Sequence, residues 1–406
     1  MKKAISVAVI SSSVGKAPRD IAYSFIFDEA HRLANRGVNV YVVRSKIEKD
    51  SLSYGIHFHG IEKKIDSQAL NALMRNITYY PPVSLLRKPA ALYWENLYAS
   101  NVSRVIGKNN INLVHAHFIY PEGFAGFIVK RWFKIPLIIT AHGYDLNVVP
   151  EYSYGLRLKS QYDLLIRRVI SYADRLIVPS KLLYLRALEI GADKSKISVL
   201  PNAVDVNRFN PYVDGEIFRK KYKLDDDPII MVIRGLNKHY RVDKVIEIVK
   251  KMPKEMRFKF VIIGNGELRS ELMSMAGNLL NKKIIFLGQI LHSQIPYAIA
   301  AANIVFDPCP IGQGINVLET MATGRPCIGV KTNGLWDYII DNITGYLVNL
   351  DDINEIVEKI NYLLDNPDEA KHMGMNGRKI VEEKFNIEKR IEKIISLYES
   401  LSAGGS

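Results

Sequence analysis

The stretch from Ile304 to Val330 reads IVFDPCPIGQGINVLETMATGRPCIGV. An apolar run ends at Asp307, and a loop with Gly312 and Gly314 follows it. A helical pattern then begins at Ile315 and leads into a second apolar run, PCIGV. A strand, a helix and a strand in this order are typical of a crossover unit between parallel strands. The stretch therefore predicts an α/β fold.

The same alternation of apolar runs and amphipathic stretches extends over the whole chain, which is typical of parallel sheets covered on both faces. In the first half, a helix is predicted at 20–36 and strands are predicted at 4–10, 38–43, 112–116, 136–140, 175–178 and 197–200. In the second half, strands at 228–233, 258–264, 284–288, 304–308 and 326–330 alternate with helices at 241–251, 266–276, 293–302, 315–323 and near 334–340. Three more helices are predicted at 352–365, 368–384 and 386–401.

Residues 201–228 interrupt this alternation with proline, asparagine and charge clusters, which indicates an interdomain connection. We therefore predict two doubly wound parallel-sheet domains, residues 1–205 and 206–385, that face each other across a cleft. The last helix, about 386–401, is expected to pack back on the first domain. Ligands of such sheets bind beyond the carboxyl ends of the strands.

The composition excludes several classes of protein. With 406 residues and 48% apolar content, the chain is not disordered or collagen-like. Its two cysteines, Cys309 and Cys327, lie in no CxxC pair, so a disulfide framework or a zinc site is not expected and a cytoplasmic location fits. No run of 18 apolar residues occurs, and the start, KKAISVAVI, is interpreted as a buried strand rather than a signal peptide.

The formal net charge of +13 lies entirely in the first half. Residues 1–200 carry 28 Lys and Arg against 15 Asp and Glu, whereas residues 201–406 carry 27 of each sign. The total alone suggests nucleic acid binding, but no recognition motif accompanies it. The asymmetry favours two domains with different partners, one of them polyanionic or membrane-like.

The helix predicted from Ile315 has the features of a nucleotide-sugar site. Backbone amides at 314–316 would present the positive end of the helix dipole to a diphosphate. Glu319, one turn further on, could accept two hydrogen bonds from a ribose diol, although it could also merely cap or pair on the helix. Gly264 and Gly266 follow a strand as a lone GxG, which fits either a phosphate-binding turn or a tight structural turn.

Six segments resemble the retaining glycosyltransferases of family 4, which have the GT-B fold of two Rossmann-like domains. They are TAHGYDL (140–146), IVPSKLLYLRALEIGADKSKISVLPNAVDVNRF (177–209), VIIGNGELRSEL (261–272), IIFLGQI (284–290), LETMATGRPCIG (318–329) and NGLWDYIIDNITGYLV (333–348). The resemblance implies transfer of a sugar from a nucleotide sugar with retention at the anomeric carbon and without an obligatory metal. It also implies that the C-terminal domain binds the nucleotide and the N-terminal domain binds the acceptor.

The resemblance also places individual residues. His142 would lie beside the donor sugar, and its position after a predicted strand favours a site residue over a packed core histidine. Asp145 would support the same loop, His117 is a weaker acceptor-side candidate, and His115 is expected to be buried in packing. The residues expected on the acceptor side are Lys16, His117 and Asp145.

Two departures from the family pattern concern the donor site. Counting back from Glu319 places Ile311 where the family has its first glutamate, so the carboxylate that contacts the donor sugar is absent. The usual Gly-Arg-Leu reads RGL at 234–236, and the usual Lys-Gly reads YR at 240–241, so both cations are displaced by one position. The expected donor-binding residues are Gly15, Arg234, Gly235, Tyr240, Gly264, Gly266, Gln289, Gly314, Ile315, Asn316 and Glu319. The expected catalytic residues are His142, Lys238, Arg241 and Glu319.

Aromatic residues alternate with cations in the basic half. Residues 79–98 combine four tyrosines and Trp94 with Arg87 and Lys88, and a second basic cluster with tyrosines lies at 152–168. Such clusters suit either a bilayer interface or an ordinary packed helix with a solvated face. Together with these clusters, the resemblance to family 4 implies a metal-independent transferase that moves a hexose-type sugar from a UDP- or GDP-sugar, without further cofactor, to a glycan or lipid-linked acceptor at the cytoplasmic membrane face. The alternatives are an inactive nucleotide-sugar-binding partner and a GT-B epimerase.

Overall fold

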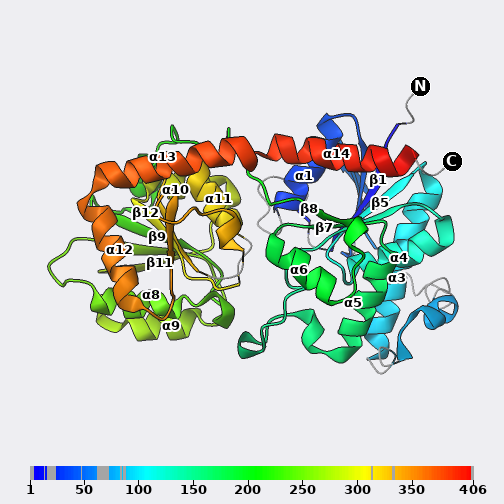
Figure 1. The fold of residues 1–406 in the computed structure, drawn as a ribbon, viewed down its shortest axis with the longest axis horizontal. Coiled ribbons are helices and arrows are strands. Elements are labelled where there is room, and N and C mark those ends of the chain that lie inside the picture. The colour runs from blue at the N-terminus through cyan, green and yellow to red at the C-terminus, as the bar shows by residue number, and fades with distance from the viewer. Residues whose placement is uncertain are drawn as a thin grey trace. The chain divides into compact units, whose positions relative to one another are not determined.

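The computed structural model describes residues 4–12, 14–15, 24–46, 48–61, 73–82, 85, 88–311, 314–331 and 334–403. The chain divides into two compact units, which we describe separately. Unit 1 comprises Met1–Pro201 and Ile391–Ser406, and unit 2 comprises Asn202–Arg390. Both units consist of helices packed around one sheet (Figure 1).

Unit 1 contains one mostly parallel sheet whose order is β3-β4-β2-β1-β5-β6-β7-β8. Only β3, which pairs with β4, runs antiparallel among the described strands. The strands are β1 (Ser6–Ile10), β2 (Asn39–Val43), β3 (Ser51–Ser53), β4 (Ile56–His59), β5 (Leu113–His117), β6 (Leu137–Thr140), β7 (Arg175–Val178) and β8 (Ile197–Val199). The helices are α1 (Ser24–Asn35), α3 (Pro89–Lys108), α4 (Glu122–Phe133), α5 (Ser160–Tyr172), α6 (Lys181–Glu189) and, from Ile391 on, α14 (Ile387–Ala403).

The alternation of side chains along β5 separates the two faces of this sheet. Val114 and Ala116 belong to an apolar core that also contains residues of α3, α4 and α5. His115 and His117 point to the opposite face, where α1 and α14 contribute Glu29 and Tyr398. The sheet is therefore covered on both faces, as the continuous apolar strands predicted.

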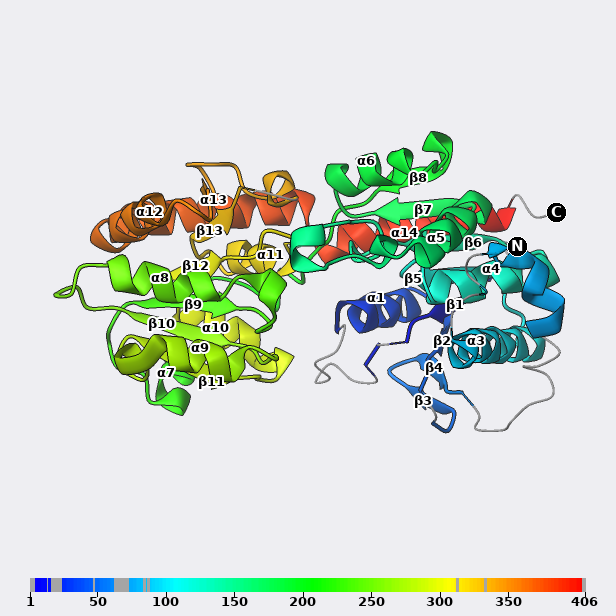
Figure 2. The same ribbon diagram turned by 90° about the horizontal axis from the view of Figure 1, so that it is seen from below.

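Unit 2 contains a fully parallel sheet whose order is β11-β10-β9-β12-β13-β14 (Figure 2). The strands are β9 (Ile229–Ile233), β10 (Lys259–Ile263), β11 (Ile284–Gly288), β12 (Ile304–Asp307), β13 (Cys327–Val330) and β14 (Gly345–Val348). The helices are α7 (Glu216–Tyr222), α8 (Asp243–Lys251), α9 (Arg269–Ala276), α10 (Ile295–Ala301), α11 (Ile315–Ala322), α12 (Ile353–Asp365) and α13 (Pro367–Lys384). Residues of α8 and α12 pack on one face, and those of α7, α10 and α11 pack on the other.

Several predicted elements differ from the observed ones. Residues 201–228 are not only a connection, because they include α7, whose Phe218 is buried in the core of unit 2. The helix expected near 334–340 is a single 3-10 turn, Leu335–Asp337. Strands β3, β4 and β14 were not predicted, because they are short and polar or lie in a turn-rich stretch.

Among the parallel strands, the direction of strand order reverses between β1 and β5 in unit 1 and between β9 and β12 in unit 2. At such a point the loops that leave two adjacent strands diverge to opposite faces and open a crevice for a ligand. The fold therefore places candidate ligand-binding sites at the carboxyl ends of these four strands.

Candidate functional site

Arg234 and Asp307 lie at the point of reversal in unit 2, directly after β9 and at the end of β12. The Arg234 guanidinium donates from Nε to Oδ1 of Asp307 at 2.7 Å and also pairs through Nη2 with Oδ2. Burial disfavours the charged guanidinium, but the Asp307 carboxylate outweighs it and holds the pKa of Arg234 above its ordinary value. Arg234 was predicted to bind the donor, but Asp307 neutralises its charge within the unit.

The other two predicted cations differ in their surroundings. Arg241 donates from Nη2 to Asp243 at 3.1 Å, so its charge is also shared with a carboxylate. Lys238 is exposed at the start of a 3-10 turn, and its ammonium has no hydrogen bond or ion pair with any residue that the structure describes. Tyr240 closes this turn over Gly235, where a Cβ would lie 2.8 Å from its ring. Of the three predicted cations, Lys238 is therefore the one whose charge is not shared with a carboxylate among the described residues.

The amino end of α11 begins at Gly314, whose φ of 71° is in the left-handed region. A Cβ at this position would lie 2.6 Å from the Tyr338 ring, so both the conformation and the space require glycine. As a glycine, Gly314 offers no side chain to cap the helix. Asn316 accepts a hydrogen bond from Arg234 through Oδ1, while its buried Nδ2 has no partner among the described residues. Ile315 and Asn316 thus open a helix whose first backbone amides have no partner within the helix.

Glu319 lies in the second turn of α11, and its side chain is 8% exposed. Its Oε1 is 3.0 Å from Nε2 of His292. Its Oε2 has no partner in the described ranges. Ile311, the residue in place of the family's first glutamate, is 3% exposed and offers no polar atom in its side chain. The sequence analysis did not select His292. Its position, four residues after the end of β11, could have marked it as a candidate.

Gly264 and Gly266 let the loop after β10 pack against the loop after β9. Gly264 has a φ of 150°, and a Cβ there would lie 1.8 Å from the carbonyl oxygen of Arg234. A Cβ at Gly266 would lie 2.5 Å from the backbone of Leu236. This close backbone approach accounts for both glycines and favours the tight structural turn. Gln289, after β11, is exposed.

In unit 1, Asp145 holds the loop that follows β6. The residue is fully buried, and its carboxylate accepts from the backbone N–H of Ile119 at 2.9 Å, Gly143 at 3.0 Å and His142 at 3.2 Å. Burial raises its pKa, although these hydrogen bonds oppose the shift. Both oxygens are occupied, so we assign Asp145 to positioning the loop and not to contacting an acceptor.

His142 and His117 form a pair at the ends of β6 and β5. Nε2 of His142 lies 3.1 Å from Nδ1 of His117, and their rings are stacked with centroids 5.3 Å apart. His142 is half-buried, whereas His117 is 2% exposed. His117, predicted on the acceptor side, therefore lies behind His142 and supports it.

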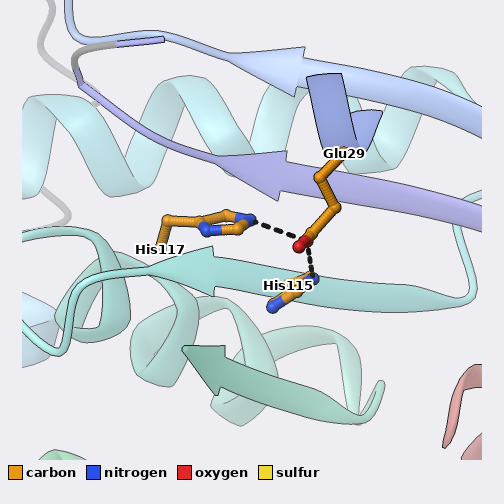
Figure 3. A group of neighbouring side chains, drawn as sticks. All are labelled: Glu29, His115 and His117. Atoms are coloured by element: carbon orange, nitrogen blue, oxygen red, sulfur yellow. Dashed lines mark ion pairs between the residues drawn. The ribbon is translucent and has the colours of Figure 1, made fainter. Parts of the chain in front are cut away.

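Glu29 joins His115 and His117 on the face covered by α1 (Figure 3). Its Oε1 is 3.5 Å from Nε2 of His117 and 3.9 Å from Nδ1 of His115. These residue types also bind metals, but both nitrogens of His115 hydrogen bond protein hydroxyls at 2.7 Å, those of Tyr398 and Thr140. The hydrogen bonds explain the buried His115, which was expected to be a packing residue. Glu29 could have been noticed as an acid among the buried apolar positions of its helix.

Glu122 begins α4 and connects it to the loop after β1. Its Oε1 accepts from the backbone N–H of Ser12 at 2.9 Å and also from the Ser12 hydroxyl. Its Oε2 is buried without a partner among the described residues. Burial raises the pKa of Glu122 to about 7, although the bonds from Ser12 oppose this shift. Gly15, further along the same loop, is buried, and Lys16 lies outside the described residues.

The expected membrane-facing aromatics are partly core residues. Tyr80 and Tyr98 are each 3% exposed, and their hydroxyls bond Glu95 and the Val43 carbonyl. Trp94 is 46% exposed. In the second cluster, Arg157 and Arg167 both pair with Asp163, which leaves less free charge than the sequence suggested. Arg87 lies outside the described residues.

The fold and its sites place the chain among the GT-B proteins, which consist of two such doubly wound units. The chain belongs to the glycosyltransferases of family 4: residues 24–208 match the model "Glycosyltransferase Family 4", and residues 214–380 match "Glycosyl transferases group 1". The resemblance seen in the sequence is thereby confirmed. The protein is a glycosyltransferase.

Curated relatives match over most of the chain. One is N-acetyl-alpha-D-glucosaminyl L-malate synthase of Bacillus anthracis, which is 25% identical over 89% of this chain and 92% of its own. Another is the GDP-mannose-dependent alpha-(1-6)-phosphatidylinositol monomannoside mannosyltransferase of Mycolicibacterium smegmatis, 25% identical over 72% of this chain and 78% of its own. A third is the UDP-Gal:alpha-D-GlcNAc-diphosphoundecaprenol alpha-1,3-galactosyltransferase of Escherichia coli, which is 27% identical over 73% of this chain and 77% of its own.

Solved structures share the fold. Sucrose-phosphate synthase from Thermosynechococcus elongatus superimposes with a TM-score of 0.80 over 98% of this chain and 100% of that chain, at 20% identity. Anabaena HepE in complex with UDP-glucose superimposes with a TM-score of 0.75 over 98% of this chain and 100% of that chain, at 16% identity.

Proposed function

We propose that this glycosyltransferase moves a hexose-type sugar, with retention at the anomeric carbon, from a UDP- or GDP-sugar to a glycan or lipid-linked acceptor. Two relatives support these donors, since their names specify UDP-galactose and GDP-mannose. The same names specify a lipid-linked and a phosphatidylinositol acceptor. We assign the donor to unit 2 and the acceptor to unit 1.

The observation that carries the proposal is the amino end of α11. The residue before the helix, Gly314, has no side chain that could cap it, the buried Nδ2 of Asn316 lacks a described partner, and Oε2 of Glu319, one turn further on, has no hydrogen bond with a described residue. Amides and an amide side chain suit the oxygens of a diphosphate, and a carboxylate suits the hydroxyls of a ribose. The diphosphate and the ribose of a nucleoside diphosphate could thus both bind to groups of this one helix.

The chemistry assigned to the remaining residues follows from charge. Negative charge develops on the departing diphosphate, so the α11 amides and the Lys238 ammonium would stabilise it most in the transition state. In unit 1, we propose that His142, supported by His117, is a catalytic residue. The apolar Ile311 stands where the family has its first glutamate, so we propose that the leaving phosphate itself assists the attack of the acceptor and that no metal or further cofactor is required.

Calorimetry with UDP and GDP tests the donor site. We expect Glu319→Ala to weaken binding of the preferred nucleotide about tenfold or more, because a carboxylate that bonds a ribose contributes about 1.5–3 kcal/mol. Glu369→Ala, at an exposed position of α13, is the matched control and should bind as the wild type does. If Glu319→Ala bound both nucleotides unchanged, the donor-site assignment would be wrong.

A second candidate is a catalytically inactive nucleotide-sugar-binding partner. Two observations favour it: Asp307 neutralises Arg234, and the apolar Ile311 replaces the family's first glutamate. Tight binding of UDP or GDP, with no sugar transferred or hydrolysed from any donor sugar, would support this candidate over the transferase.

We also propose peripheral contact between unit 1 and an anionic membrane on the cytoplasmic side, and no binding of nucleic acid. The charge excess of the first half and the exposed Trp94 support membrane contact. In the part of the chain that the structure describes, no helix is long and apolar enough to cross a bilayer.

A further inference from the structure

Three polar side chains from separate segments of unit 2 form a linear chain of hydrogen bonds that ends at Glu319. Arg208 belongs to the segment that enters the unit, His292 begins a 3-10 turn, His292–Gln294, before α10, and Glu319 lies on α11. Nη2 of Arg208 is 2.9 Å from Nδ1 of His292, and Nε2 of His292 is 3.0 Å from Oε1 of Glu319.

The direction of both hydrogen bonds follows from the chemistry of the end groups. A guanidinium can only donate, so Nδ1 of His292 must accept and carries no proton. The imidazole is then neutral with its proton on Nε2, which is donated to the Glu319 carboxylate. Arg208 therefore selects the tautomer of His292 that can donate to Glu319.

Arg208 is itself held independently of the imidazole ring. Its Nη2 also donates to the backbone carbonyl of His292 at 2.5 Å, and its guanidinium carbon lies 5.2 Å from the centroid of the Phe209 ring. The His292 and Glu319 side chains are only 19% and 8% exposed. The three groups are thus packed into one arrangement before any nucleotide binds.

We infer that Arg208 and His292 are positioning residues for the nucleotide: they fix Glu319 so that Oε1 is held by the protein and Oε2 is presented to a ribose hydroxyl. The inference rests on the proposed function of Glu319. A carboxylate fixed in advance loses less conformational entropy when the ribose binds, so the pair increases the preference for a ribonucleotide. It acts on recognition of the ribose and leaves the contacts to the diphosphate unchanged.

The experiment compares affinities for UDP or GDP and for the 2′,3′-dideoxy form of the same nucleotide, measured by calorimetry on the full chain. The ratio of the two affinities reports recognition of the ribose hydroxyls alone, which a general loss of structure would not change selectively. We expect a ratio of about ten or more in the wild type, as for hydrogen bonds to a charged group.

Two substitutions of His292 separate the effect of its hydrogen bond to Glu319 from the effect of its packing. His292→Asn keeps a polar group near Arg208 but cannot reach Glu319, so the ratio should fall toward that of Glu319→Ala. His292→Gln places an amide N–H near the former Nε2 and should retain most of the ratio. Equal ratios in the wild type and His292→Asn would overturn the inference, as would an equal loss in His292→Asn and His292→Gln.

The role of Arg208 is tested by a double-mutant cycle. Arg208→Met should lower the ratio in the wild-type background and have no further effect on it in the His292→Asn background, because Arg208 acts through His292. Independent effects in the two backgrounds would overturn this part. The proposed function fails separately, if Glu319→Ala itself leaves the ratio unchanged. A ratio lost in Glu319→Ala but kept in His292→Asn overturns the inference alone.

Discussion

At the scale of single residues, the proposed donor site of unit 2 depends on which charges are already paired within the unit. Arg234 is separated from Asp307 by 73 positions in the chain, yet their side chains form a two-point ion pair. The Asp307 side chain is fully buried and that of Arg234 is 15% exposed. A pair of this kind stabilises little by itself, but each partner is costly without the other.

Asp307→Asn should therefore lower the free energy of unfolding of unit 2 by about 3–5 kcal/mol, because it leaves the Arg234 charge without its buried partner. Urea denaturation monitors the loss. Glu247→Gln, which removes one of the two carboxylate partners of Lys244 at a site where the glutamate is 46% exposed, should change stability by less than about 1 kcal/mol. The double variant Arg234→Met/Asp307→Leu should recover part of the loss. Equal stability of Asp307→Asn and the wild type would contradict this account.

Glu122 gives unit 1 a defined pH dependence. Its pKa is raised from 4.5 to about 7, so the folded chain retains a proton that the unfolded chain releases. Its contribution to stability is full below about pH 4.5, decreases as pH rises toward 7, and is lost above that value. The total change is about 3 kcal/mol.

We expect the unfolding free energy of unit 1 in the wild type to fall between pH 5 and pH 8 relative to Glu122→Gln, which cannot ionise. Chemical denaturation at a series of pH values measures the difference between the two proteins. Parallel pH profiles would show that Glu122 does not titrate in this range.

At the scale of elements, the start of α11 at the proposed donor site requires glycine at position 314. Gly314 adopts a positive φ and also lies against the Tyr338 ring. Gly277, which follows α9, likewise has a positive φ of 51°, but a Cβ there would have nothing within 4 Å. The two positions therefore separate backbone strain from crowding at the helix start.

Gly314→Ala should weaken UDP or GDP binding about tenfold, because the displaced ring moves the first amides of α11. Gly277→Ala should reduce stability by about 1 kcal/mol through strain alone and leave nucleotide affinity unchanged. Calorimetry and thermal denaturation of both variants make the comparison. Similar nucleotide affinity in the two variants would argue against a donor site at this helix.

At the scale of the whole molecule, the net charge of +13 belongs to the first half of the sequence, and the second half is neutral. The unit proposed to bind the donor therefore has no general positive field, and the charge proposed to act on the diphosphate is the local one of Lys238. The basic half carries the proposed contact with anionic lipid.

Co-sedimentation with vesicles of anionic phospholipid should show binding at low salt that decreases strongly above about 0.15 M salt, because the Debye length there is only about 8 Å. Trp94→Ser should weaken the binding further, since this ring is exposed. Vesicles of zwitterionic lipid are the control and should bind little. No binding to anionic vesicles at either salt concentration would end the membrane proposal.

The sequence alone was sufficient for the two doubly wound sheets, the family and the start of α11 at Ile315, since periodicity, glycine positions and motif spacing are local properties of the chain. The pairing of Arg234 with Asp307, of Glu29 with His117 and of Arg208 with His292 and Glu319 was decided only by the tertiary structure. These partners are far apart in the chain, and they meet because parallel strands and crossover helices bring their ends to the same edge of a sheet. A charge counted in sequence is therefore a candidate ligand, and only the fold shows whether it is already neutralised.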